Sequence, residues 1–184
     1  AGDLPRRAYV HDARGRAVWH YLRRAPHERY YGFGEVSGPL DKHGARLRML
    51  PKDALGYDAV RTDPLYKHWP FYITYNAERG IAYGLLYDTH AEAVFDMGQE
   101  INALRGAHRY AQFMDGDIDY YFVYGPTFAD VLAKFARLTG TPALLPRYTL
   151  GYMASTMLYT EAPDAQRQLE QFIAECAAHD IPCD

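Results

Sequence analysis

The sequence predicts a mostly β protein, with a β-sandwich first and the beginning of a parallel strand–helix architecture after it. Short runs of β-prone residues, separated by turn signals, recur from residue 9 to residue 124 and predict the sandwich. A change to helical spacing after residue 126 predicts the second part. Aromatic residues form 15% of the chain and include 17 tyrosines, whose amphipathic rings suit sheet surfaces that are partly exposed to solvent. The same rings also suit stacking on sugars, and composition alone does not choose between the two.

Six segments of the first part have the composition and spacing of strands: residues 17–22, 70–75, 81–87, 93–97, 108–114 and 118–124. A turn at 12–15 precedes the first of them. A turn at 76–80 joins the second and third into the clearest hairpin of the sequence. Asp115-Gly116 between the last two is a strong hairpin-turn dipeptide, so we expect these two strands to pair with each other.

The segment from residue 32 to residue 64 differs from its surroundings. It is rich in glycine and proline and shows little periodicity. A loop of this length inside a compact domain is usually either functional or disordered. We expect a functional loop here.

A helix is predicted directly after the sandwich. Thr127 is a good N-cap, Asp130 follows three residues later as in a capping box, and Gly140 ends the helical spacing. The prolines that follow this helix mark the best domain boundary, which divides residues 1–145 from residues 146–184.

The second part has the pattern of one strand–helix unit. We expect a strand at 149–155, a helix at 164–179 with Cys176 on its apolar face, and the start of another strand at 181–184. A single strand–helix unit cannot bury both faces of its strand. The natural chain is therefore expected to continue past Asp184.

Charge, cysteine and histidine content argue against several classes of function. A net charge of −3 gives no electrostatic reason to expect nucleic acid or an anionic membrane as a partner. No apolar run approaches the ~18 residues that a membrane span needs. The two cysteines make no disulfide framework and the eight histidines show no metal-binding spacing, so we expect neither a metal nor a cofactor.

Four segments, in this order, resemble motifs of glycoside hydrolase family 31: Tyr31-Gly32-Phe33-Gly34-Glu35; Pro51-Lys52-Asp53; Asp63-Pro64-Leu65-Tyr66 with Trp69-Pro70-Phe71-Tyr72-Ile73; and a series from Asp119-Tyr120-Tyr121-Phe122-Val123 to Leu150-Gly151-Tyr152. Each segment alone is a weak signal. Together, in order and at matching spacing, they cover residues 30–184, which is nearly the whole chain.

The resemblance implies an N-terminal β-supersandwich of the galactose mutarotase-like kind, followed by the start of a (β/α)8 TIM barrel. It implies a retaining glycosidase that cleaves α-glucosidic or α-xylosidic bonds in oligosaccharides or α-glycosides. Such enzymes need a nucleophile and an acid, two carboxyl groups about 5 Å apart, and the family carries both on later barrel strands. We therefore name no catalytic residue in this chain and expect the fragment alone to be inactive.

The resemblance also places five residues near the sugar. Asp53, preceded by Lys52, matches the family's loop aspartate, which accepts hydrogen bonds from sugar hydroxyls in the −1 subsite. Lysine stands where the family usually has arginine, and it lacks the planar guanidinium group that can bond two acceptor oxygens at once. Met157, Leu158 and Tyr159 follow the first barrel strand, and Tyr159 is expected to form a wall of the pocket. The alternatives are that Asp53 is only a turn residue and that Tyr159 is an exposed loop tyrosine.

Other readings of the sequence remain open. A non-catalytic carbohydrate-binding β-sandwich is one alternative, although it would have no use for a barrel's first strand and helix. An α-glucan lyase or a transglucosidase of the same family would keep the same early scaffold. We expect Glu35 to bond the backbone amides around Gly32 and Gly34 rather than to act as an acid. The tail resembles bacterial intracellular members, so a cytoplasmic location is expected, and a second copy of the chain is left open as a partner.

Overall fold

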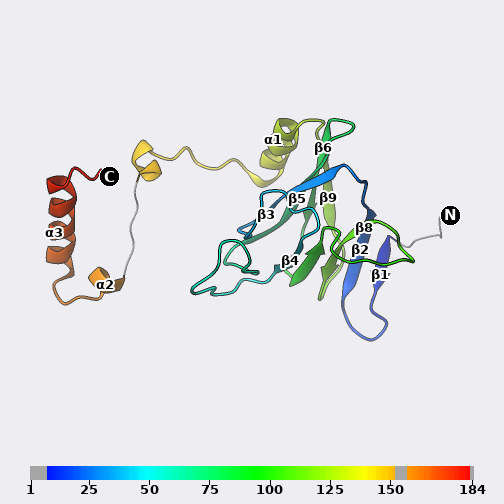
Figure 1. Ribbon diagram of the computed structural model, residues 1–184, viewed down its shortest axis with the longest axis horizontal. Helices are drawn as coiled ribbons and strands as arrows, with labels where there is room; N and C mark the ends of the chain where they lie inside the picture. The colour runs from blue at the N-terminus through cyan, green and yellow to red at the C-terminus, as the bar shows by residue number, and fades with distance from the viewer. Residues whose placement is uncertain (1–7, 152–156, 183–184) are drawn as a thin grey trace. The chain divides into compact units, whose positions relative to one another are not determined.

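The computed structural model describes residues 8–151 and 157–182. Their contacts form two compact units, the first ending at Gly140 and the second beginning at Thr141. In the first unit the described residues form nine strands and one helix (Figure 1): β1 (Tyr9–His11), β2 (Val18–Arg23), β3 (Glu28–Gly34), β4 (Arg46–Met49), β5 (His68–Asn76), β6 (Ile81–Tyr87), β7 (Ala93–Asp96), β8 (His108–Phe113), β9 (Tyr120–Tyr124) and α1 (Phe128–Thr139).

These strands form two antiparallel sheets, which confirms the mostly β fold class. One sheet has five strands in the order β1-β2-β8-β7-β4, and the other has four in the order β3-β5-β6-β9. The expected hairpin is also confirmed, because β5 and β6 pair from Phe71 opposite Leu86 to Asn76 opposite Ile81.

A core of buried aromatic and aliphatic side chains joins the two sheets. It includes Tyr30 and Tyr72 from the four-stranded sheet and Phe95 and Phe113 from the five-stranded sheet. Tyr72 and Phe95 meet edge to face, with ring centroids 6.0 Å apart, which is a favoured geometry for an aromatic pair. Burial of a large apolar side chain favours folding by about 1.5–3 kcal/mol, so this cluster is the main source of stability in the sandwich.

Helix α1 covers the other face of the four-stranded sheet. Phe71 and Ile73 alternate with Tyr72 along β5, so they point away from the inter-sheet core and pack with Val131 of α1. Gly84 on β6 permits this close approach. A Cβ atom at that position would lie 2.7 Å from Cε2 of Phe71 and 3.0 Å from Cγ1 of Val131.

The predicted caps of α1 are confirmed. The Thr127 hydroxyl accepts a hydrogen bond from the Asp130 amide at 3.1 Å, and the Asp130 carboxylate accepts one from the Thr127 amide at 3.2 Å. At the other end, the Gly140 amide donates to the Ala136 carbonyl at 2.8 Å. The capping box satisfies two backbone donors that the helix itself leaves unpaired.

The expected hairpin at Asp115-Gly116 is wrong. Strand β8 pairs with β2 and β7, whereas β9 pairs with β6 in the other sheet. The dipeptide still makes a tight turn, in which Oδ1 of Asp115 accepts from the Gly116 amide at 2.8 Å. The chain uses this turn to pass from one sheet to the other, where Val123 of β9 is buried with the residues beneath α1.

The expected long loop between residues 32 and 64 is also partly wrong. It contains the end of β3 and all of β4, which pairs with β7 from Arg46 opposite Asp96 to Met49 opposite Ala93. Leu47 and Met49 are buried and alternate with exposed arginines, so the four residues carry a strand pattern that the surrounding glycines and prolines obscure. The irregular stretches that remain lie between β3 and β4 and between β4 and β5.

In the second unit the described residues form a 3-10 helix, η1 (Arg147–Leu150), and two α-helices, α2 (Met157–Thr160) and α3 (Ala165–Ala178). The predicted second helix is confirmed, and Cys176 is buried on it. The predicted strand at 149–155 is wrong at its start, because Thr149 and Leu150 belong to η1 and turn the chain. Residues 152–156 lie outside the described residues, as do 183 and 184 of the last predicted strand.

The helices carry no sign of a membrane segment. Within residues 8–151 and 157–182, none is both long enough and apolar enough to cross a membrane.

Candidate substrate-binding site

The loop between β4 and β5 carries Lys52 and Asp53, the first two candidate sugar-binding residues. In Figure 1 this loop extends from the sheets beyond the ends of their strands. Both side chains are exposed. The hydroxyl of Tyr66 donates a hydrogen bond to Oδ1 of Asp53 at 2.9 Å. The loop therefore presents to solvent a carboxylate that is already held by one neighbour.

Hydrogen bonds close the base of this loop. The Lys52 amide donates to the Leu65 carbonyl at 3.3 Å. Nε2 of His68 lies 3.1 Å from the carbonyl oxygens of both Leu50 and Leu65, and it must be the donor because carbonyl oxygens only accept. These bonds join the two ends of the loop, so Asp53 projects from a fixed base rather than from a free chain.

A second set of hydrogen bonds holds the same loop. The Arg48 amide donates to Oδ2 of Asp63 at 2.9 Å, and Nη2 of Arg48 donates to the Asp63 carbonyl at 2.7 Å. Arg48 belongs to β4 and Asp63 precedes β5, so this pair ties the loop to the five-stranded sheet.

The Tyr31-Gly32-Phe33-Gly34 motif forms a bulge in β3, where the register with β5 shifts between the two glycines. Gly34 has a φ of +84°, and a Cβ there would meet the Lys67 carbonyl oxygen at 2.8 Å. Only glycine combines this backbone angle with so close an approach. The motif therefore brings β3 against the start of β5, next to the base of the Asp53 loop.

The expected role of Glu35 is wrong. Its carboxylate lies 3.9 Å from the ammonium of Lys67 and is half exposed, rather than bonded to the amides of Gly32 and Gly34. Gly32 and Gly34 instead lie opposite Tyr72 and His68 of β5, and the Glu35 amide itself donates to the Lys67 carbonyl at 2.8 Å.

The other three candidates lie in the second unit, on helix α2. Met157 and Leu158 are 72% and 74% exposed, so neither lines a buried pocket within this unit. Tyr159 is half-buried, and its ring lies 5.9 Å from that of Phe172 on α3. It borders a polar hollow of about 290 Å³ with Arg167, Gln168, Gln171, Phe172 and Glu175. Contact of these residues and of Asp53 with one sugar stays a prediction.

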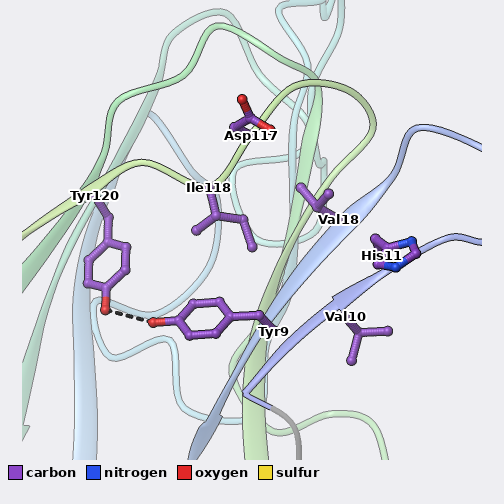
Figure 2. A pocket seen from close by; sticks show the side chains of 7 residues that line it. All are labelled: Tyr9, Val10, His11, Val18, Asp117, Ile118 and Tyr120. Carbon is purple, nitrogen blue, oxygen red and sulfur yellow. Dashed lines mark hydrogen bonds between the residues drawn. The ribbon is translucent and has the colours of Figure 1, made fainter.

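Sequence reasoning missed a pocket of about 410 Å³ at the β1 edge of the five-stranded sheet, lined by Tyr9, Val10, His11, Val18, Asp117, Ile118 and Tyr120 (Figure 2). The hydroxyls of Tyr9 and Tyr120 lie 3.0 Å apart. The ring of Tyr9 stacks on the buried His20 at 4.8 Å. No local motif could reveal this pocket, because only strand pairing brings its lining together.

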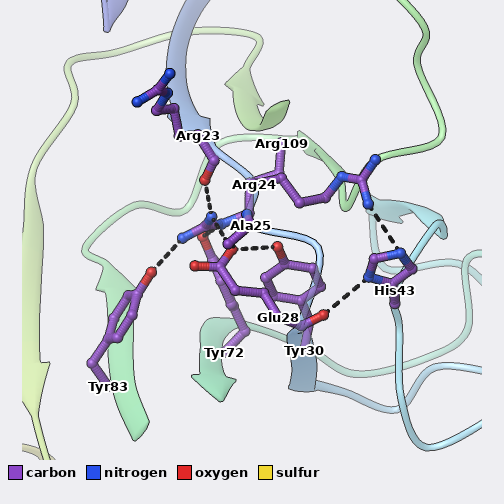
Figure 3. Close-up of polar contacts among 9 residues, drawn as sticks. All are labelled: Arg23, Arg24, Ala25, Glu28, Tyr30, His43, Tyr72, Tyr83 and Arg109. Carbon is purple, nitrogen blue, oxygen red and sulfur yellow. Dashed lines mark hydrogen bonds and ion pairs between the residues drawn. The ribbon is translucent and has the colours of Figure 1, made fainter. Parts of the chain in front are cut away.

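A buried charged network, shown in Figure 3, was missed as well. Arg109 on β8 is 1% exposed and donates to Glu28 at 3.0 Å, to the Tyr83 hydroxyl at 2.7 Å and to the Arg23 carbonyl. The Tyr30 hydroxyl also donates to Glu28, at 2.8 Å. The network joins the two sheets through their core. Its two charged side chains, Arg109 and Glu28, are buried, so they offer no surface to a substrate.

No metal centre is apparent in the described part of the chain. Among residues 8–151 and 157–182 there is no group of three or more histidine, cysteine, aspartate or glutamate side chains that could hold an ion.

The sheets, the bulge and the loop together define a galactose mutarotase-like β-sandwich that presents a carboxylate. Residues 5–96 match the family model of the glycosyl hydrolase 31 N-terminal galactose mutarotase-like domain. The chain belongs to glycoside hydrolase family 31.

Curated relatives agree with this assignment. The chain is similar to alpha-glucosidase 2 of Bacillus thermoamyloliquefaciens, with 34% identity over 85% of this chain and 19% of that protein. It is also similar to an alpha-glucosidase of Saccharolobus solfataricus, with 32% identity over 72% of this chain and 18% of that one. The chain thus spans about a fifth of the length of each.

A solved structure is similar over nearly the whole chain. The family 31 dextranase of Flavobacterium johnsoniae, in complex with glucose, aligns with a TM-score of 0.83 and 27% identity. The alignment covers 99% of this chain and 20% of the dextranase.

Proposed function

We propose that this chain is part of a retaining glycoside hydrolase that cleaves α-glucosidic or α-xylosidic bonds. The observation that carries the proposal is the 34% identity to an alpha-glucosidase over 85% of the chain. On this proposal residues 146–184 begin the catalytic (β/α)8 barrel. The nucleophile and the acid lie on barrel strands beyond Asp184, about 5 Å apart as retention requires.

In this proposal the sandwich contributes to substrate binding and not to bond cleavage. The Asp53 carboxylate accepts hydrogen bonds from sugar hydroxyls, and such charge-assisted bonds are about twice as strong as neutral ones. Asp53 is exposed beside the hydrogen-bonded base of its loop, which supports the role, because a sugar hydroxyl can reach the carboxylate without displacing protein. Lys52, Met157, Leu158 and Tyr159 complete the proposed contacts, with Tyr159 as a wall of the pocket.

The test is the release of nitrophenol from a panel of aryl α- and β-glycosides. The full-length gene product and this 184-residue chain are assayed side by side. We expect activity on an α-glucoside or an α-xyloside from the full-length protein, and none from the shorter chain. A full-length product that binds sugars but hydrolyses none of the panel would overturn the proposal in favour of a binding module or a lyase. Activity of the shorter chain would show that the catalytic carboxylates have been misplaced.

A further inference from the structure

The hydrogen bond between Tyr66 and Asp53 leaves the carboxylate half occupied. Oδ1 of Asp53 accepts from the Tyr66 hydroxyl at 2.9 Å, and Oδ2 accepts no hydrogen bond from any residue that the structure describes. An ionised carboxylate has about four lone-pair sites on its two oxygens, so acceptor capacity remains for a ligand. Both side chains are exposed, and a ligand can therefore reach them.

The backbone around Tyr66 is fixed on both sides. The Leu65 carbonyl before it accepts from the Lys52 amide and from Nε2 of His68. The Lys67 carbonyl after it accepts from the Glu35 amide at 2.8 Å. Tyr66 thus stands on an anchored segment, and Asp53 directly follows Lys52, whose amide bonds to that segment. A donor that is fixed in this way restricts the rotamers of the Asp53 side chain before any ligand arrives.

The protonation state of Tyr66 suits a donor. The hydrogen bond to the Asp53 carboxylate is the largest influence on the pKa of Tyr66, and it raises that pKa above its usual value of 10.0. The phenol therefore keeps its proton at neutral pH and donates it to Asp53.

We propose that Tyr66 is a positioning residue for substrate binding, whose hydroxyl holds one oxygen of Asp53 so that the other accepts from a sugar hydroxyl. The inference rests on the proposed function, because it assigns Tyr66 to the same α-glycoside subsite. Without the Tyr66 hydroxyl, the carboxylate must be ordered by the sugar itself, and this ordering weakens productive binding.

The experiment is a double-mutant cycle in the full-length gene product, assayed with the α-glycoside that it hydrolyses fastest. Asp53→Ala should lower kcat/KM by about 10-fold or more. Tyr66→Phe should lower it by roughly 3- to 10-fold, because a hydrogen bond to a charged group is weaker when solvent can reach it. If Tyr66 acts through Asp53, Tyr66→Phe has no further effect on the Asp53→Ala protein.

Tyr57→Phe is the matched control. Tyr57 lies on the same loop, is 54% exposed, and makes no hydrogen bond to Asp53. Its loss of a hydroxyl should leave kcat/KM and the melting temperature unchanged. The melting temperature of Tyr66→Phe should also stay at the wild-type value, because the ring remains and only an exposed hydroxyl is lost.

The outcomes separate the two claims. If Asp53→Ala lowers kcat/KM but Tyr66→Phe does not, the positioning role is wrong and the proposed sugar contact stands. Additive losses in the double variant would likewise overturn the positioning role, since Tyr66 would then act independently of Asp53. If Asp53→Ala leaves the kinetics unchanged, the sugar contact fails and the positioning role fails with it, although the panel result for hydrolysis still stands.

Discussion

At the scale of single residues, the interior of the sandwich is unusual for the charge that it contains. A buried guanidinium is costly unless its donors are satisfied. Arg109 meets this requirement with Glu28, Tyr72, Tyr83 and the Arg23 carbonyl. Its positive charge then acts on other buried groups in the same core.

His20 is one of those groups, and it leads to a prediction about pH. Burial, followed by the charge of Arg109, lowers the pKa of His20 to about 4 from its usual 6.5. The folded protein therefore holds His20 neutral while the unfolded chain takes up a proton between pH 6.5 and pH 4. The contribution of His20 to the free energy of unfolding is fully present above pH 6.5. It declines as the pH falls towards 4 and changes no further below that pH.

The measurement is the melting temperature as a function of pH for wild type and His20→Gln, an amide that can still bond the Tyr87 hydroxyl. We expect the variant to lose less stability than wild type between pH 6.5 and pH 4. His90→Gln is the control, because His90 is exposed and its replacement should leave the slope unchanged. Equal slopes for His20→Gln and wild type would contradict the assignment.

At the scale of elements, α1 is fixed by signals that lie close together in the sequence. Thr127 and Asp130 are three residues apart, and Gly140 follows the last turn. Such local patterns need no knowledge of the rest of the chain. The helix was therefore predictable to within a residue at both ends.

The capping box gives a prediction at this scale. Thr127→Ala removes the hydroxyl that accepts from the Asp130 amide and should lower the free energy of unfolding by about 0.5–2 kcal/mol. Thr139→Ala is the control, because its hydroxyl only bonds the Phe135 carbonyl inside the helix. The check is urea denaturation followed by circular dichroism. Equal midpoints for Thr127→Ala and Thr139→Ala would mean that the cap contributes little.

The strands show where prediction from sequence fails. Strand character is predicted correctly for β2, β5, β6, β7, β8 and β9, but the predicted pairing of β8 with β9 is wrong. Pairing depends on contacts that are distant in sequence, and Asp115-Gly116 turns between sheets as readily as within one. β4 was missed because four residues between glycines and prolines carry too short a pattern to stand out.

The candidate site was predictable to a similar extent. The Lys52-Asp53 motif was visible through its resemblance to the family. The bond from Tyr66 to Asp53 spans 13 residues and depends on how the loop closes, so no spacing rule reveals it. The pocket at Tyr9 and Tyr120 was invisible for the same reason, since its two tyrosines are 111 residues apart.

At the scale of the whole molecule, the two units differ in how well they cover their apolar surfaces. The first has a shared core between its sheets and a second cluster under α1. In the second unit, Leu169 and Ile173 on α3 are 41% and 59% exposed, although the sequence pattern predicts an apolar face there. A strand–helix unit needs neighbouring units to bury such a face, and on the proposed function the rest of a barrel supplies them.

On the proposed function, the full-length protein hydrolyses an α-glycoside with retention. The most direct measurement is proton NMR of the first sugar released, recorded before mutarotation mixes the anomers. We expect the α-anomer to appear first, because a double displacement at one carbon restores the starting configuration. If the β-anomer appears first, the enzyme inverts the configuration and is not a retaining glycosidase.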